Sequence, residues 1–191
     1  MTPGRAQVVE TMTNARATTV DAPIPAESIR PTQSKPKRKR REMANILHRI
    51  SIDAPTESVH GLIATKDGIE QWWTGHPVRG DDALGGQLSV YFSDAGEAAA
   101  VFEVVEQTPQ EIAWRCVDGP DDWRDTRISF AFKRSPDGGT TLLFSHEDWK
   151  SENEFMHGCS TNWGAYLTSL KYGAEGRGFQ PYPAGEVSRW G

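Results

Sequence analysis

His146 is the side chain in this sequence that could best do acid–base chemistry. It follows Leu142 and Phe144 at every second position of an alternating run, so we expect its imidazole to point to the same side as these apolar side chains. A neutral imidazole there could orient a bound molecule or act as a general base. A strand-end histidine bonded to a neighbouring backbone group would fit the same pattern. His146 is therefore a candidate, and no catalytic residue is assigned from the sequence.

Two polar side chains near the end of the chain could work with His146. Asn162 and Tyr166 lie close to Trp163 in a segment with helical periodicity, and either could supply a polar contact to a ligand. Cys159 in the same segment is most simply a small apolar residue. The sequence has no glycine-rich phosphate loop, no nucleophile motif and no His, Cys or acidic cluster with metal-ligand spacing. We therefore expect neither a metal nor a cofactor.

Aromatic side chains are the second group of candidates. Trp72, Trp73, Trp114 and Trp163 fall in predicted elements, where they could line a pocket and offer indole N–H groups to a ligand. They could equally be plain core packing, because large aromatic side chains dominate a core of this size. The predicted ligand-binding residues are Trp72, Trp73, Phe92, Trp114, Phe130, Phe144, His146, Asn162, Trp163 and Tyr166.

The elements that must position these residues are those of one α+β domain over residues 43–191. A strand is predicted over 46–52, followed by two short helices, the second over 66–73. Five alternating strands with turn-like connections follow, which predicts an antiparallel meander with one apolar face. The last element is a helix over 152–174 with a single apolar stripe. The sheet and this long helix must cover each other's apolar faces.

Four segments carry a resemblance to a known family. They are Ile69-Glu-Gln-Trp-Trp-Thr74, Ile112-Ala-Trp-Arg115, Cys159-Ser-Thr-Asn-Trp-Gly164 and Glu175-Gly-Arg-Gly-Phe-Gln-Pro-Tyr182. In this order they resemble the SRPBCC (START-like) superfamily, and within it the homologues of the activator of the ninety-kilodalton heat-shock protein ATPase. The resemblance implies a helix-grip fold, in which a curved antiparallel sheet wraps around a long C-terminal helix and encloses an apolar cavity. Members bind lipids, sterols, polyketides or hormones there and some catalyse cyclisation, so the fold does not settle the function.

Charge divides the chain at about residue 42. Residues 1–42 hold nine basic and four acidic side chains, a net charge of +5, and the remainder carries −10. Because the few apolar positions of 1–42 follow no period, we expect a disordered tail. Its basic run, 35–41, could be a nuclear-import signal or an arm for nucleic acid or anionic lipid, or a solvated tail upstream of the mature protein. The acidic domain behind it argues against a sequence-specific nucleic-acid binder.

Composition excludes several further classes of protein. No stretch approaches the ~20 apolar residues that a membrane-spanning helix needs, and the N-terminus lacks the apolar segment of a secretory signal. Two cysteines cannot build a disulfide scaffold or a four-thiolate zinc site. We therefore expect a cytoplasmic protein, and the sequence leaves its oligomeric state open.

Three functions remain. The first is the binding of a small hydrophobic molecule, such as a lipid or polyketide, in a cavity between the sheet and the C-terminal helix. The second is a polyketide-cyclase-like enzyme that uses His146 with Asn162 or Tyr166. The third, implied by the resemblance alone, is a co-regulator of a chaperone ATPase. We rank binding first, because the residues that could do chemistry are few, and the chaperone partner last, because the chain has one such domain.

Overall fold

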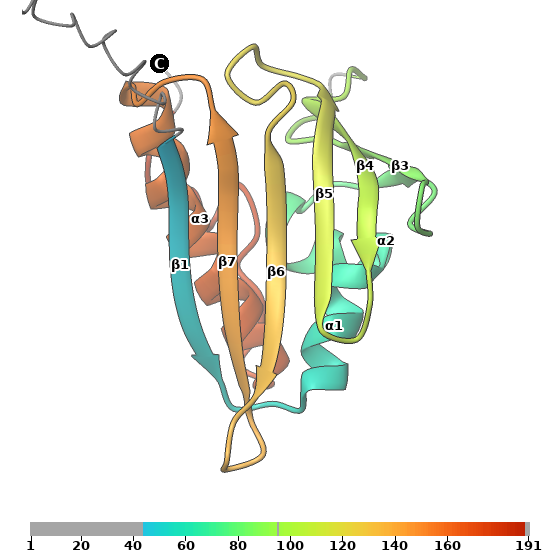
Figure 1. Ribbon diagram of the computed structural model, residues 1–191, viewed down its shortest axis with the longest axis vertical. Coiled ribbons are helices and arrows are strands. Elements are labelled where there is room, and N and C mark those ends of the chain that lie inside the picture. The colour runs from blue at the N-terminus through green and yellow to red at the C-terminus, as the bar shows by residue number, and fades with distance from the viewer. Residues whose placement is uncertain (1–43, 95, 190–191) are drawn as a thin grey trace, which may run out of the picture. The chain divides into compact units, whose positions relative to one another are not determined.

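The structure of the protein, a computed structural model, describes residues 44–94 and 96–189. The predicted tail over 1–42, with its basic run, lies outside the described residues. Within them, seven strands form one antiparallel sheet in the order β1-β7-β6-β5-β4-β3-β2 (Figure 1). The strands are β1 (Ala44–Ile52), β2 (Arg79–Gly80), β3 (Gln87–Val90), β4 (Ala100–Gln107), β5 (Glu111–Asp118), β6 (Arg127–Arg134) and β7 (Thr140–Trp149).

Alternation of apolar residues gives the sheet its buried face. In β6, Ile128, Phe130 and Phe132 are buried, and the residues between them are half-buried. The antiparallel register with β7 sets Ile128 opposite His146 and Phe130 opposite Phe144. Cross-strand partners point to the same face of a sheet, so His146 lies on the buried face, as its phase in the sequence predicts.

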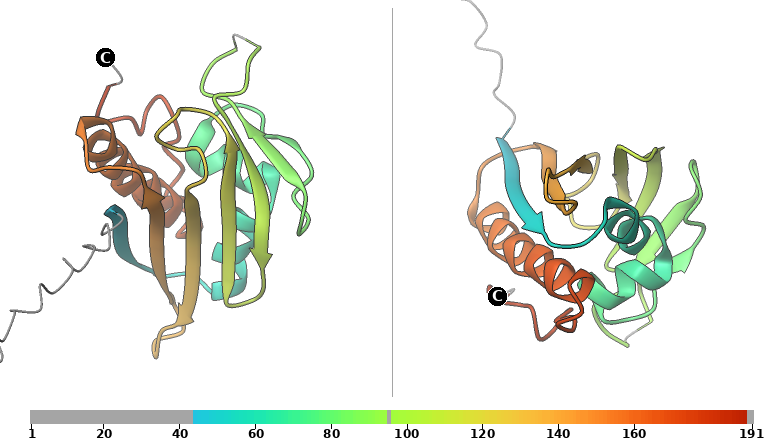
Figure 2. Two further views of the ribbon diagram at one scale, coloured as in Figure 1. Left: turned by 45° about the horizontal axis from the view of Figure 1, so that its top comes forward. Right: turned by 90° about the horizontal axis from the view of Figure 1, so that it is seen from below.

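The helices all lie on that buried face (Figure 2). They are α1 (Thr56–Ala64), α2 (Lys66–Ile69), a π-helical turn η1 (Glu70–Thr74) and the long α3 (Glu154–Ala174). α3 begins where the Asn153 side chain accepts a hydrogen bond from the Met156 N–H at 2.9 Å, which satisfies one of the free donors of the first turn. The predicted fold class, a curved antiparallel sheet with a long C-terminal helix in an α+β helix-grip arrangement, is confirmed.

Two details of the sheet differ from the sequence prediction. β2 was not predicted, because two residues are too few to show a period. β3 ends at Val90, so Phe92 lies in the loop that follows and not in the strand. The Ala99 N–H donates to the Val90 carbonyl at 2.8 Å and closes that loop, so the chain has already left the ladder when it reaches Phe92.

The π-helical turn directs two adjacent tryptophans. It ends at Gly75, which has a φ of 64° and donates its N–H to the Glu70 carbonyl at 2.9 Å. A Cβ at Gly75 would lie 2.2 Å from the Tyr182 carbonyl oxygen, so only glycine allows the C-terminal segment to pass this close. Trp72 and Trp73 are both buried by this turn, with their rings stacked at 6.1 Å.

Candidate functional site

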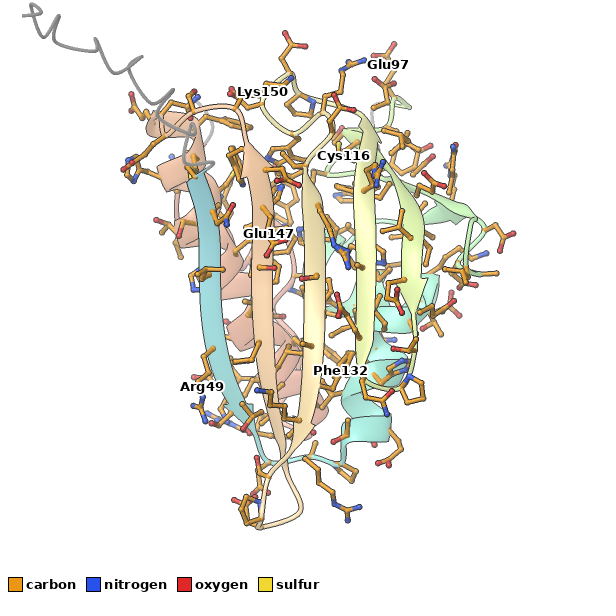
Figure 3. All side chains as sticks on the ribbon, viewed as in Figure 1. Arg49, Glu97, Cys116, Phe132, Glu147 and Lys150 are labelled. Atoms are coloured by element: carbon orange, nitrogen blue, oxygen red, sulfur yellow. The ribbon has the colours of Figure 1, made fainter. Side chains whose placement is uncertain are left out.

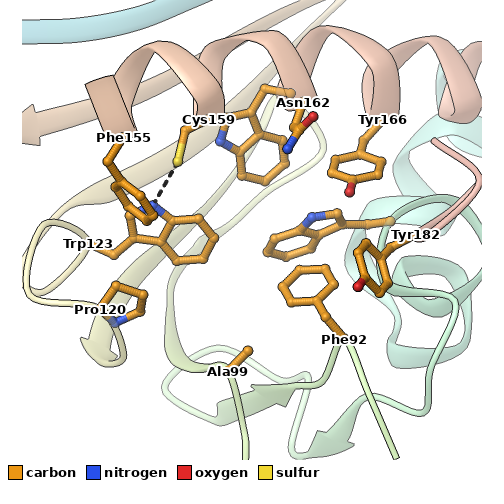
Figure 4. Close-up of a pocket in the computed structure, with 11 residues that line it drawn as sticks. Phe92, Ala99, Pro120, Trp123, Phe155, Cys159, Asn162, Tyr166 and Tyr182 are labelled. Atoms are coloured by element: carbon orange, nitrogen blue, oxygen red, sulfur yellow. Dashed lines mark hydrogen bonds between the residues drawn. The ribbon is translucent and has the colours of Figure 1, made fainter. Parts of the chain in front are cut away.

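A pocket of about 280 Å³ lies between α3, η1, the loops 91–99 and 118–126, and the C-terminal segment (Figure 4). Among the described residues that line it, seven of eleven are aromatic and none carries a charge. The lining residues are Trp73, Phe92, Ala99, Pro120, Trp123, Phe155, Cys159, Asn162, Trp163, Tyr166 and Tyr182. This volume is close to the lower end of the roughly 300–1,000 Å³ usual for ligand pockets, so the pocket suits a small molecule.

One end of the pocket is closed by the C-terminal segment. The Tyr182 N–H donates to the Trp73 carbonyl at 2.9 Å, which ties the segment to the π-helical turn. Phe92 stands edge-on to both rings, at 68° to Trp73 and 70° to Tyr182, with ring centres 5.7 and 5.3 Å apart. The three rings therefore pack together at this end of the pocket.

The other end is formed by Trp123, which comes from the loop between β5 and β6. Its indole N–H donates to the Cys159 sulfur at 3.3 Å, and 6% of the residue is exposed. Its carbonyl accepts hydrogen bonds from both the backbone N–H and the hydroxyl of Thr126, at 2.9 and 2.5 Å. The loop thus holds this tryptophan against the first turns of α3.

Asn162 makes three hydrogen bonds to the C-terminal segment. Its Oδ1 accepts from the backbone N–H groups of Val187 and Ser188 at 3.0 and 2.8 Å, and its Nδ2 donates to the Ser188 carbonyl at 2.8 Å. Asn162 therefore fastens the C-terminal segment beside the pocket and has little capacity left for a ligand.

Two tyrosine hydroxyls are free polar groups at the wall of the pocket. Tyr166 is 5% exposed, and neither its hydroxyl nor that of Tyr182 has a hydrogen-bond partner in the part of the chain that the structure describes. Burial raises the pKa of Tyr166 strongly, and the nearby Glu186 carboxylate and Tyr182 add to the rise. The Tyr166 hydroxyl therefore stays protonated, and both hydroxyls can donate to, or accept from, a bound molecule.

His146 lies behind this pocket and does not line it. It is fully buried, its Nδ1 accepts from the Trp163 indole N–H at 3.2 Å, and its Nε2 lies 2.8 Å from the Thr126 hydroxyl. Because that hydroxyl donates to the Trp123 carbonyl, Nε2 must carry the proton and donate. Burial lowers the pKa of His146 to about 3. The imidazole is neutral, both nitrogens are occupied, and no lone pair remains for a general base.

The structure divides the predicted site residues into two sets. Trp73, Phe92, Asn162, Trp163 and Tyr166 line the pocket. The remaining five, Trp72, Trp114, Phe130, Phe144 and His146, are buried in the core. The two sets are in contact, since Trp114 stacks on Trp73 at 6.1 Å and 8°, and Phe144 lies 4.6 Å from Trp163 between ring centres.

Sequence reasoning missed two important walls, Trp123 and Tyr182. Trp123 stands in an acidic loop, and a large apolar side chain among carboxylates is the available signal. Tyr182 follows the last helix in a segment without periodicity. Phe155 and Cys159 on α3 also line the pocket and are absent from the predicted ligand-binding residues.

Cys159 places a thiol, which could act as a nucleophile, in the wall of the pocket, but this thiol is inert. Both Cys159 and Cys116 are buried and free. Burial raises the pKa of the Cys159 thiol to about 12 and that of Cys116 to about 11. The thiolate that would attack a substrate is therefore not populated near neutral pH.

The described residues contain neither a metal-binding cluster nor a helix that could span a membrane. Across 44–94 and 96–189, no group of three or more His, Cys, Asp or Glu side chains is arranged to hold a metal ion. Among the helices of the same residues, none has the length and apolar character to cross a membrane.

Comparisons with known proteins point to one family. The sequence model of the family described as "Activator of Hsp90 ATPase homolog 1-like protein" matches residues 53–174. The Aha1 dimer from Colwellia psychrerythraea is 30% identical, with a TM-score of 0.62, over 71% of this chain and 98% of that chain. No curated protein matches the sequence.

Two more distant structures share the fold. CalU16 from Micromonospora echinospora has a TM-score of 0.60 at 20% identity, covering 76% of this chain and 73% of that chain. PFC0360w, an HSP90 activator from Plasmodium falciparum, has a TM-score of 0.56 at 18% identity, covering 69% of this chain and 96% of that chain. At these identities the likeness concerns the fold alone.

Proposed function

Because the chain belongs to the family of activator of Hsp90 ATPase homolog 1-like proteins, we propose that its sheet and long helix form a binding protein for a small, mostly apolar molecule. The observation that carries this proposal is the aromatic pocket with two unpartnered tyrosine hydroxyls at its wall. Covering an apolar surface of this kind with a ligand lowers the free energy, and the hydroxyls can fix the orientation of that ligand.

The residues favour binding over catalysis. An acid–base mechanism needs two convergent groups that can exchange protons with a bound molecule. Both nitrogens of His146 are committed to the protein, the Asn162 amide does not exchange protons, and Cys159 remains a thiol. Of the residues named for a cyclase-like mechanism, Tyr166 alone faces the pocket with a group that can exchange a proton, and one neutral phenol does not make an acid–base pair.

A co-regulator of a chaperone ATPase is the second candidate, supported by the family and by the 30% identical Aha1 from Colwellia. Stimulation of a chaperone's ATP hydrolysis by the purified protein would support this candidate over ligand binding. We also propose a cytoplasmic location, which agrees with two buried free thiols, since reducing compartments keep cysteines unpaired.

The test of binding compares two neighbouring alanines. Ala99 lines the pocket, whereas the adjacent Ala98 is exposed and does not. Ala99→Phe should fill the pocket, and Ala98→Phe adds the same side chain outside it. We expect the wild type and Ala98→Phe to bind the neutral probe 2-naphthalenemethanol, measured by its fluorescence, and Ala99→Phe to lose this binding. Equal binding by all three proteins, or by none of them, would refute the proposal.

A further inference from the structure

Charge around the aromatic pocket indicates which ligands it would accept. We propose, on the basis of the binding function above, that the pocket prefers an aromatic molecule carrying a positive charge, such as an arylalkyl ammonium, to neutral and anionic analogues. The inference rests on the absence of a cation from the described lining, on the carboxylates around it and on the aromatic rings themselves.

The described lining offers nothing to a bound anion. None of its eleven residues is Lys, Arg or His. A carboxylate or phosphate placed among these rings would lose its hydration and find no cation in return, which is a costly form of burial. Fatty acids and phosphorylated lipids are therefore poor occupants.

Acidic side chains outnumber basic ones in the two loops that line the pocket. The loops 91–99 and 118–126 together hold six acidic side chains and one basic one. That single cation, Arg124, is paired with Asp118 at 3.1 Å. The nearby Lys150 donates to the Asp121 carbonyl. These two loops therefore carry a net negative charge, which would raise the local concentration of cations.

Two lining groups have carboxylates nearby, one in the C-terminal segment and one in the loop 118–126. The pKa of Tyr166 is raised by burial and by Glu186, and the pKa of Cys159 is raised by burial and by Asp122. Both carboxylates are on half-buried residues, so solvent screens them less than it screens a fully exposed charge. These two carboxylates thus lie close enough to the lining to raise the pKa of two of its groups.

The rings add attraction of their own. Phe92 stands at steep angles to Trp73 and to Tyr182, and Trp73 lies 4.8 Å from Trp163 between ring centres. Aromatic rings attract cations through their π faces, and tryptophan does so most strongly. The unpartnered Tyr166 hydroxyl can accept an N–H from an ammonium group. An aromatic cation would therefore use the apolar walls, the π faces and this oxygen together.

The test uses three probes of nearly equal shape with the full-length protein at pH 7. They are 2-naphthylmethylamine, which is cationic, 2-naphthalenemethanol, which is neutral, and 2-naphthoate, which is anionic. We expect the cation to bind roughly fivefold more tightly than the neutral probe, and the anion to bind more weakly than either. The advantage of the cation should shrink as salt is added, because salt screens the carboxylates.

A matched pair of variants locates the charge. Glu186→Gln should weaken binding of the cation roughly threefold and leave the neutral probe unchanged. Glu147→Gln is the control, because Glu147 follows His146 on β7 and points to the opposite, outer face of the sheet (Figure 3). Equal effects of the two variants on the cation would overturn the inference.

The outcomes also separate this inference from the proposed function. If the neutral or anionic probe binds as tightly as the cation, the charge preference is wrong and ligand binding stands. If none of the three probes binds and the wild type behaves like Ala99→Phe, both proposals are wrong.

Discussion

Lowering the pH from 7 to 4 should destabilise this protein by about 3 kcal/mol through His146 alone. The histidine has a pKa of about 3 in the folded protein, where burial disfavours its charged form, and about 6.5 in the unfolded chain. Below pH 6.5 the unfolded chain therefore binds a proton that the native protein does not. The stability contributed by the neutral imidazole is complete above pH 6.5 and is lost as the pH falls from 6.5 to 3. Each pH unit in that window costs about 1.4 kcal/mol.

Urea unfolding at pH 7 and at pH 4 measures this effect when the wild type is compared with His146→Gln. Glutamine offers both a donor and an acceptor to Thr126 and Trp163 but does not titrate. We expect the variant to be less stable at pH 7 by about 1–3 kcal/mol, because it cannot reproduce both hydrogen bonds. The loss of stability between pH 7 and pH 4 should then be about 3 kcal/mol smaller in the variant. The pKa of Glu175 is lowered by the hydrogen bond from the Asp53 N–H and by Lys171, so this carboxylate also contributes stability that is lost as the pH falls. Its contribution is the same in the wild type and in the variant, and it cancels when the two are compared.

Nitrogen chemical shifts of the imidazole give an independent reading. They should report a proton on Nε2, none on Nδ1, and no titration between pH 7 and pH 4. A His146 that titrates near pH 6.5, or a variant that loses as much stability as the wild type between pH 7 and pH 4, would refute the reasoning. Either result would mean that water reaches the imidazole and that the hydrogen-bond pattern around it is different.

Three further predictions concern the glycines of α1 and α2, the thiols and the C-terminal segment. Gly61→Ala should stabilise α1 by about 0.5–1 kcal/mol, because nothing lies within 4 Å of the new Cβ. Gly68→Ala should instead destabilise the protein, because its Cβ would lie 2.5 Å from a backbone oxygen of α1. Thermal melts of the two variants and the wild type measure both effects. At pH 8 a disulfide reagent should modify neither Cys116 nor Cys159 in the native protein and both in urea, since burial raises both pKa values; rapid native modification would contradict this. Asn162→Ala should speed hydrogen exchange at the backbone amides of 187–188, and unchanged exchange would show that another contact holds the segment.

The elements that follow a period in the sequence were predictable. The alternating strands and the apolar stripe of the last helix appear in the structure, because a sheet with one apolar face and an amphipathic helix can bury those faces only against each other. The two-residue β2 and the π-helical turn were not predictable. Two residues carry no periodicity, and the five-residue segment Glu70–Thr74 reads as an ordinary helical turn.

Five of the ten predicted ligand-binding residues line the pocket, because periodicity gives only part of the information that a site requires. Alternation and helical spacing place a side chain on the inner face, but they do not say whether it meets another side chain or an open pocket. Trp72 and Trp73 show this clearly, since they are adjacent and both buried. The Trp72 indole donates to the Leu62 carbonyl at 2.9 Å within the core, whereas Trp73 lines the pocket. Loop walls such as Trp123 follow no period, so periodicity cannot assign them.

Trp163 belongs to both the pocket wall and the core, and this determines how the pocket must be tested. Its ring lines the pocket, its N–H donates to His146, and its ring centre lies 4.6 Å from that of Phe144. Truncating such a buried tryptophan to alanine typically costs about 3–5 kcal/mol, so Trp163→Ala would lose binding whether or not the ring touches a ligand. A side chain added at Ala99 changes the pocket and spares these contacts. Loss of binding in Ala99→Phe with retained stability would therefore report on the pocket alone.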